Sequence, residues 1–162
     1  GLKLLWTDVQ KLNFLDPFGN QNLTYQSRNV MSQNISTGIK KLISDANNVV
    51  PTKSIDEAKK LYKDENYVFI DLRDIRELRR EGKIPGSFSC PRGMLEFWID
   101  PDSPYHKEIF NQNKTYIFYC ASAWRSALSG KAAIEMGLNP VAHLAGGFTA
   151  WKKAGMPIEE LP

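Results

Sequence analysis

Cys120 is the residue whose type and position best suit nucleophilic chemistry. It ends the apolar run "TYIFYC" (115–120), and the pattern "RSALSGKAAIEMG" (125–137) predicts a helix soon after it. The first amides of a helix lack intrahelical partners, and the helix dipole adds partial positive charge there. A tight loop around that end would form a concave site for an anion, and a cysteine inside it would be held as the thiolate.

The residues after Cys120 suit such a loop. Those that would line it are Ala121, Ser122, Ala123, Trp124, Arg125 and Ser126. Arg125 offers a forked set of donors for an oxyanion, and Ser126 offers a hydroxyl and a candidate helix N-cap. Trp124 either recognises a donor or partner, or packs over the helix start. The alternative for Cys120 is a buried core thiol at the end of a strand, and spacing alone does not decide between the two.

Composition places the chain among globular proteins with one domain, or one domain and an extension. Of its 162 residues, 42% are apolar and 24% charged, and the formal net charge is +3. No long run of Lys and Arg occurs, so we expect neither nucleic acid nor a membrane surface as a partner. The small positive excess suits a small anionic substrate. Without paired His or Cys spacing we expect no metal site, and no nucleotide signature indicates a cofactor.

The two cysteines, Cys90 and Cys120, are too few for a disulfide framework. No apolar stretch is close to the roughly 20 residues that span a bilayer, and the N-terminus lacks a secretory signal pattern. We therefore expect a cytoplasmic location with both thiols reduced. Cys90 is either a resolving thiol near the loop or a small buried residue, and the burial statistics for cysteine favour the second.

Apolar runs alternate with helical patterns in the second part of the chain. Strands are expected at 67–72, 115–120 and 140–144, and helices at 54–63, 74–82, 125–137 and 148–155. This alternation predicts an α/β domain with a mainly parallel sheet. In such sheets ligands bind beyond the carboxyl ends of the strands, which is where Cys120 is expected.

The first part of the chain has a different character. Residues 1–30 are rich in Asn and Gln and show no persistent periodicity, whereas Ile35, Ile39 and Leu42 have helical spacing. We predict an N-terminal extension over 1–30 upstream of a natural start at Met31. Residues 31–50 are predicted to form a helix and linker, and residues 51–162 the domain itself.

Three segments resemble the rhodanese-like sulfurtransferase family. They are "FIDLRDIRELRREGKIPGSFSCP", "FYCASAWRSA" and "LAGGFTAWKKAGMPIE". They occur in the family's order within about Ser54 to Glu159. The first matches the family's aliphatic–Asp–aliphatic–Arg opening at Asp71-Leu72-Arg73, and the last matches its closing pattern at Gly146-Gly147 and Trp151.

The resemblance implies a central parallel sheet of about five strands with helices on both faces. It further implies that the Cys120 thiolate takes a sulfane sulfur from an anionic donor such as thiosulfate and becomes a persulfide. The sulfur would then pass to a thiophilic acceptor, which is cyanide, a thiol or a protein. The amides from Ala121 to Ser126 would cradle the persulfide, and Arg125 would bind the donor.

The length of the loop separates sulfur transfer from phosphate chemistry. Related phosphatases of the cell-division-cycle type have five residues between the cysteine and the arginine, whereas Ala121–Trp124 are four here. A shorter ring of amides leaves less room for phosphate oxygens, so sulfur transfer is favoured. The alternatives are a cysteine-dependent phosphatase or arsenate reductase of related fold, and a non-catalytic sulfur carrier or interaction module.

Four further residues have predicted structural properties. Many family members have Gly where this chain has Ala123, so a positive φ there would cost on the order of 1 kcal/mol. We expect the Asp71 carboxylate to cap the following turn and Arg73 to connect neighbouring loops. If these charges are buried, removing either interaction should cost a large free energy of folding. Arg92 lies either at the mouth of the site, where it attracts anions, or in an ordinary salt bridge, and the second is preferred.

Overall fold

The computed structural model describes residues 33–162, and its sheet has five strands, all paired in parallel. The strands are β1 (Thr52–Lys53), β2 (Tyr67–Asp71), β3 (Phe88–Ser89), β4 (Thr115–Tyr119) and β5 (Val141–Leu144), in the spatial order β1-β5-β4-β2-β3. The predicted parallel α/β sheet is therefore confirmed. The predictions for residues 1–30 and for a start at Met31 lie outside the described residues.

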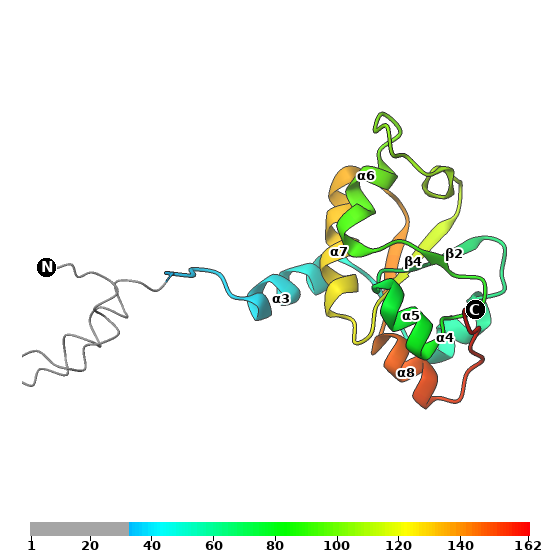
Figure 1. The fold of residues 1–162 in the computed structure, drawn as a ribbon. Helices are drawn as coiled ribbons and strands as arrows, with labels where there is room; N and C mark the ends of the chain where they lie inside the picture. Colours follow the sequence, from blue (N-terminus) through cyan, green and yellow to red (C-terminus); the bar gives the residue numbers. More distant parts are fainter. Residues whose placement is uncertain (1–32) are drawn as a thin grey trace, which may run out of the picture. The chain divides into compact units, whose positions relative to one another are not determined.

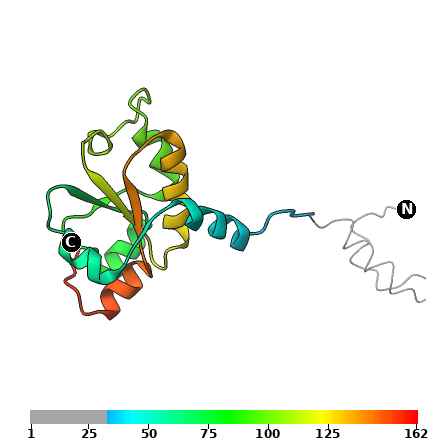
Figure 2. The same ribbon diagram turned by 180° about the vertical axis from the view of Figure 1, so that it is seen from behind.

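The described part of the chain has six α-helices and two 3₁₀ turns. The α-helices are α3 (Ile39–Val49), α4 (Ile55–Leu61), α5 (Ile75–Glu81), α6 (Leu95–Ile99), α7 (Trp124–Met136) and α8 (Gly147–Lys153); the 3₁₀ turns are η1 (Arg92–Met94) and η2 (Glu108–Phe110). Figures 1 and 2 show α4 and α8 on one side of the sheet and α6 and α7 on the other. None of these helices is long and apolar enough to cross a membrane.

The side chains of the central strand β4 alternate between two cores. Tyr116 and Phe118 contribute to the core shared with α6 and α7, whereas Ile117 and Tyr119 contribute to the core shared with α4 and α8. Because both faces of the sheet are covered, the central strands have the continuous apolar runs seen in the sequence. The helices contribute Leu95, Ile99 and Ala133 to the first core and Ala58, Phe148 and Trp151 to the second.

The register of the sheet determines where Cys120 lies. Tyr67 of β2 is paired with Thr115 of β4, and the pairing continues to Asp71 and Tyr119. The two central strands therefore end level with one another. Cys120 follows immediately, at the carboxyl end of a central strand, as predicted for a ligand site in a parallel sheet.

Local hydrogen bonds determine where the helices on either side of β2 begin. At the start of α4, the Ser54 hydroxyl accepts from the Glu57 amide at 3.1 Å and the Glu57 carboxylate accepts from the Ser54 amide at 2.9 Å, which confirms the predicted capping box. Asp74 and Glu77 form the same arrangement at the start of α5. The predicted helix 54–63 ends early, with Tyr62 as its C-cap.

The helix α3 packs against α7. Ile43 and Ala46 form a small buried cluster with Ala127, and Val50 lies so close to Gly130 that an added Cβ would be 2.7 Å from Val50 Cγ1. The glycine therefore allows the close approach of the two segments. Ile35, predicted to share the helical pattern, precedes the helix and is exposed, because α3 begins only after Gly38. The strand β1 was not predicted, since two residues are too few for a pattern.

A buried ion pair crosses the turn between β2 and α5. Asp71 and Arg73 are 0% and 1% exposed. The guanidinium donates to both carboxylate oxygens, from Nε to Oδ1 at 3.0 Å and from Nη2 to Oδ2 at 2.8 Å, and Nη2 also donates to the Gly82 carbonyl at 2.7 Å. The Arg73 guanidinium carbon lies over the Phe148 ring, 4.1 Å from the ring centroid. Arg73 thus connects β2, α5 and α8, which supports the structural role expected for it.

Replacement of Arg73 by methionine tests this role. Arg73→Met leaves the Asp71 carboxylate buried without its partner, so we expect the free energy of unfolding to fall by about 3–5 kcal/mol in urea denaturation. The control is Arg76→Met, because Arg76 pairs with Asp74 at 2.9 Å but is 82% exposed. Because this pair is exposed to solvent, its loss should lower the stability far less than the loss of the buried pair. Equal losses in the two variants would contradict a connecting role for the buried pair.

Candidate active site

Two hydrogen bonds dock the start of α8 against the cysteine loop. The Phe148 amide donates to the Cys120 carbonyl at 2.8 Å, and the Thr149 amide donates to the Ala121 carbonyl at 3.1 Å. Gly147 makes this approach sterically possible, since a Cβ there would be 2.5 Å from the Cys120 carbonyl oxygen. The N-cap of α8 is Gly146, which has no side chain to satisfy the first amides of the helix. The loop carbonyls satisfy two of them instead.

The loop continues directly into α7. Ala123 has φ 79° and is the sole non-glycine residue with positive φ in residues 33–162. It is the N-cap of α7, whose first residue is Trp124. Because many members of the family have Gly at this position, a positive φ was considered for Ala123, and the structure has it. The prediction of Ser126 as the helix N-cap is wrong. The turn at Ala123 starts the helix earlier, so Ser126 lies within its first turn.

Cys120 accepts a hydrogen bond from the helix start. The Ser126 amide lies 3.4 Å from Cys120 Sγ, within hydrogen-bond range for sulfur. Cys120 is 1% exposed and Ser126 is fully buried. A first-turn amide directed at the sulfur would stabilise a thiolate more than a thiol, because the donor carries partial positive charge. The environment of the sulfur therefore combines burial with a helix N-terminus.

The Arg125 guanidinium is paired with Glu77 of α5. Its Nη1 and Nη2 atoms donate to the two carboxylate oxygens of Glu77 at 2.8 and 2.9 Å. These hydrogen bonds are the main reason that the pKa of Glu77 falls to about 2, so the carboxylate is ionised at neutral pH. The Arg125 side chain is 40% exposed, and its pKa is raised chiefly by Glu77 and to a smaller extent by the nearby Cys120. The role of Arg125 in binding an anion stays a prediction.

The remaining predicted residues are distributed between the loop and its surroundings. Ser122 is exposed, and the Trp124 side chain is 50% exposed, so the outer side of the loop faces solvent. Arg92 forms an ion pair with Glu96 at 3.0 Å, as preferred from the sequence. Cys90 is fully buried, and burial raises the pKa of its thiol to about 12, so it stays a thiol at neutral pH.

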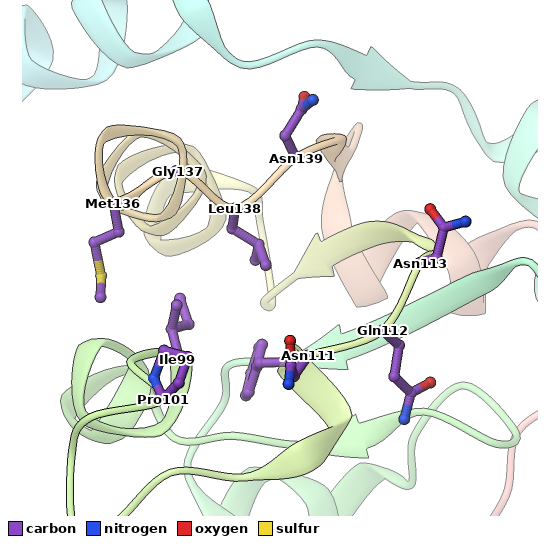
Figure 3. A pocket seen from close by; sticks show the side chains of 10 residues that line it. Ile99, Pro101, Asn111, Gln112, Asn113, Met136, Gly137, Leu138 and Asn139 are labelled. Carbon is purple, nitrogen blue, oxygen red and sulfur yellow. The ribbon is translucent and has the colours of Figure 1, made fainter.

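Two cavities lie away from Cys120. One of about 360 Å³ is lined by residues that precede β4 and β5, among them Asn111, Asn113 and Asn139 (Figure 3). It therefore lies at the amino ends of these strands, opposite the cysteine loop. A second of about 260 Å³ is bordered by Leu42, Arg92 and Leu128. Within residues 33–162, no group of His, Cys, Asp and Glu side chains is arranged to hold a metal ion.

Sequence reasoning missed Glu77 and the first residues of α8 as parts of this site. The pattern "DIRE" at 74–77 is a capping-box signature, which could have placed Glu77 at a helix start. Nothing in the sequence indicates that Glu77 meets Arg125, 48 positions further along the chain. The contact of α8 with the loop likewise depends on the tertiary arrangement.

The fold and the site together define a class of α/β proteins that carry a cysteine nucleophile candidate at the carboxyl end of a central parallel strand, at the start of a helix. Comparison with family models places the chain within this class more closely, since the model of the rhodanese-like domain matches residues 54–154. The chain belongs to the rhodanese-like domain family.

Individual relatives carry related names. The chain is 31% identical over 100 residues to thiosulfate sulfurtransferase/rhodanese-like domain-containing protein 3 of Mus musculus, and the match covers 59% of this chain and 64% of the mouse protein. It thus spans just under two thirds of that relative. A putative sulfurtransferase of Bacillus subtilis is 32% identical over 98 residues, with coverage of 60% of this chain and 85% of its own.

Two solved structures are informative in different ways. A Rhodopseudomonas palustris protein of unknown function, described as a possible tyrosine phosphatase, is 55% identical with a TM-score of 0.78, over 80% of this chain and 99% of its own. The polysulfide-sulfur transferase homodimer of Wolinella succinogenes is 27% identical with a TM-score of 0.57, over 75% of this chain and 87% of its own.

The backbone at Ala123 gives a testable prediction for the loop. Ala123→Gly should leave the free energy of unfolding unchanged or raise it by up to about 1 kcal/mol, because relief of the Cβ penalty at positive φ offsets the greater freedom of the unfolded chain. The control is Ala121→Gly in the same loop, where φ is not positive. There the added freedom of the unfolded chain should lower stability by about 0.5–1 kcal/mol. Urea denaturation of both variants measures the difference, and destabilisation by both would contradict strain at Ala123.

Proposed function

We propose that the protein transfers sulfane sulfur through a persulfide on Cys120. The observation that carries the proposal is the Ser126 amide directed at Cys120 Sγ from the first turn of α7. This donor favours an anionic sulfur, whether thiolate or persulfide. Membership of the rhodanese-like family and the sulfurtransferase names of the relatives support the same chemistry.

The reaction has two steps with one covalent intermediate. The Cys120 thiolate attacks the outer sulfur of thiosulfate, a new S–S bond forms, and the original S–S bond breaks with release of sulfite. An acceptor nucleophile then attacks the outer sulfur of the persulfide and regenerates the thiolate. Cyanide would leave as thiocyanate, and a thiol acceptor would leave as a persulfide. Both steps require an anion near Cys120, which suits the start of α7.

Intact-protein mass spectrometry tests the intermediate. After treatment with thiosulfate, the protein should gain the mass of one sulfur atom, and cyanide should remove it with formation of thiocyanate. Cys120→Ser should show neither, whereas Cys90→Ala should behave as the wild type, because the Cys90 thiol is buried and protonated. Thiocyanate production that survives Cys120→Ser would refute the mechanism. A persulfide that forms without turnover would favour the sulfur-carrier alternative.

A paired substitution tests whether Arg125 binds the donor or holds the loop. If it binds the anion, Arg125→Ala should lower kcat/KM for thiosulfate by about 10- to 100-fold, the worth of a charged hydrogen bond. The value for an organic persulfide, which has a terminal sulfur but no sulfonate group, should be much less affected. The control is Glu77→Gln, which keeps the shape of the partner and leaves Arg125 in place.

Glu77→Gln should lower stability while thiosulfate turnover is retained, because the arginine that meets the anion is still present. An equal loss with both donors in Arg125→Ala, matched by a similar loss in Glu77→Gln, would assign the pair to holding α7 against α5. In that case the anion is bound by the loop amides alone.

Phosphatase chemistry is the second candidate. It is favoured by the Rhodopseudomonas palustris structure, which is 55% identical and described as a possible tyrosine phosphatase. The four residues between Cys120 and Arg125 argue against it, because the related phosphatases have five. Efficient hydrolysis of an aryl phosphate without sulfur transfer would favour this candidate. Reduction of arsenate in the presence of a thiol reductant, measured separately, would favour the arsenate reductase alternative.

A further inference from the structure

A buried set of hydrogen bonds lies behind Cys120 and reaches two other elements. The Ser126 hydroxyl of α7 is 2.8 Å from His143 Nδ1 of β5. The opposite ring nitrogen, Nε2, is 3.0 Å from Asn47 Oδ1 of α3 and 3.5 Å from the hydroxyl of Thr52 in β1. Ser126 is 0% and His143 3% exposed, whereas Asn47 and Thr52 reach the surface.

The partners of the ring determine its tautomer. Asn47 Oδ1 is an acceptor, so His143 Nε2 carries the proton and donates it to the carboxamide. Nδ1 is then unprotonated and accepts from the Ser126 hydroxyl. Burial lowers the pKa of His143, so the ring is neutral at pH 7. The side chains within hydrogen-bond distance of the ring nitrogens belong to Ser126, Asn47 and Thr52, none of which titrates.

The same residue of α7 faces two ways. The Ser126 amide donates to Cys120 Sγ while its hydroxyl donates to His143. The direction of the amide is determined by the orientation of the first turn of α7, and the hydroxyl contact restrains that turn from behind. In contrast, Ser129 one turn later is equally buried, but its hydroxyl has no hydrogen-bond partner.

We propose that His143 is a positioning residue for Cys120, which acts by holding Ser126 so that the Ser126 amide is directed at the sulfur. For its catalytic consequence the inference rests on the function proposed above. The ring nitrogens of His143 are hydrogen-bonded to Ser126, Asn47 and Thr52 and not to Cys120, so its effect on the sulfur passes through Ser126. Its contribution is to keep one amide of α7 at hydrogen-bond distance from the thiolate.

The network also assigns a role to α3. Asn47 lies before the family match at 54–154, yet it binds the outer nitrogen of His143. Because Asn47 is accessible to water, its loss can be compensated partly by solvent. Its contribution should therefore be smaller than that of His143, and it helps to select the tautomer that accepts from Ser126.

The experiment titrates the Cys120 thiolate by its absorbance at 240 nm in the full chain, with Cys120→Ser as the blank. His143→Leu removes both hydrogen bonds at similar volume, and His143→Gln keeps only a donor toward Asn47. His143→Asn places an acceptor near the position of Nδ1 and keeps the contact with Ser126. Ser129→Ala is the matched control, because it removes a buried hydroxyl from the same helix without touching the network.

We expect the titration midpoint to rise by about one pH unit in His143→Leu and His143→Gln, a tenfold loss of thiolate below the midpoint. His143→Asn should recover most of the difference, Asn47→Ala should shift the midpoint by a smaller amount, and Ser129→Ala should leave it unchanged. Persulfide formation at pH 7 should fall about tenfold in His143→Leu and recover at high pH, where the thiolate is complete in every variant.

Three outcomes separate the possibilities. An unchanged midpoint in His143→Leu or His143→Gln would overturn the proposal. Circular dichroism shows whether each variant is folded, and if one is not, the other still gives the test. An equal shift in His143→Asn would also overturn it, since the acceptor for Ser126 would then be irrelevant. If the midpoints shift as expected but no persulfide forms in the wild type, the positioning role stands and the proposed sulfur transfer fails.

Discussion

The docking of α8 on the cysteine loop is the contact on which the rest of the site depends. The carbonyls of Cys120 and Ala121 accept from the first amides of α8 through an approach that only Gly147 allows. Because these carbonyls point toward α8, the loop is held from one side while α7 begins on the other. The first amides of α8 are therefore used to hold the loop, whereas the start of α7 directs the Ser126 amide at the Cys120 sulfur.

Two acid–arginine pairs then join this loop region to α5, and they differ in environment. Asp71 and Arg73 are almost fully buried and connect three elements, so their strength comes from the cost of leaving either charge alone. Glu77 and Arg125 lie closer to solvent and connect the starts of α5 and α7. Because the second pair is more exposed to solvent, breaking it costs less than breaking the first.

Much of the fold could be predicted from local signals in the sequence. The continuous apolar runs of β2 and β4 reflect a sheet covered on both faces, and the Ser54–Glu57 capping box is a short-range pattern. The left-handed turn at Ala123 was anticipated from a single substitution relative to the family. The pairing of Glu77 with Arg125 and of His143 with Ser126 could not be predicted, because these contacts join distant segments. The N-cap assigned to Ser126 failed for a related reason: residue preference does not reveal a turn formed by the backbone.

The burial of Cys90 has a consequence for the response to oxidants. The chain has two cysteines, and the thiol of Cys90 is buried with a pKa of about 12. A sulfenic acid formed on Cys120 by peroxide therefore lacks a reactive thiol within the chain with which to condense. Without a thiol from another molecule, further oxidation would lead to sulfinic acid and permanent loss of the nucleophile. Under the proposed function, external thiols would accept sulfur from Cys120 and would also protect Cys120 from irreversible oxidation.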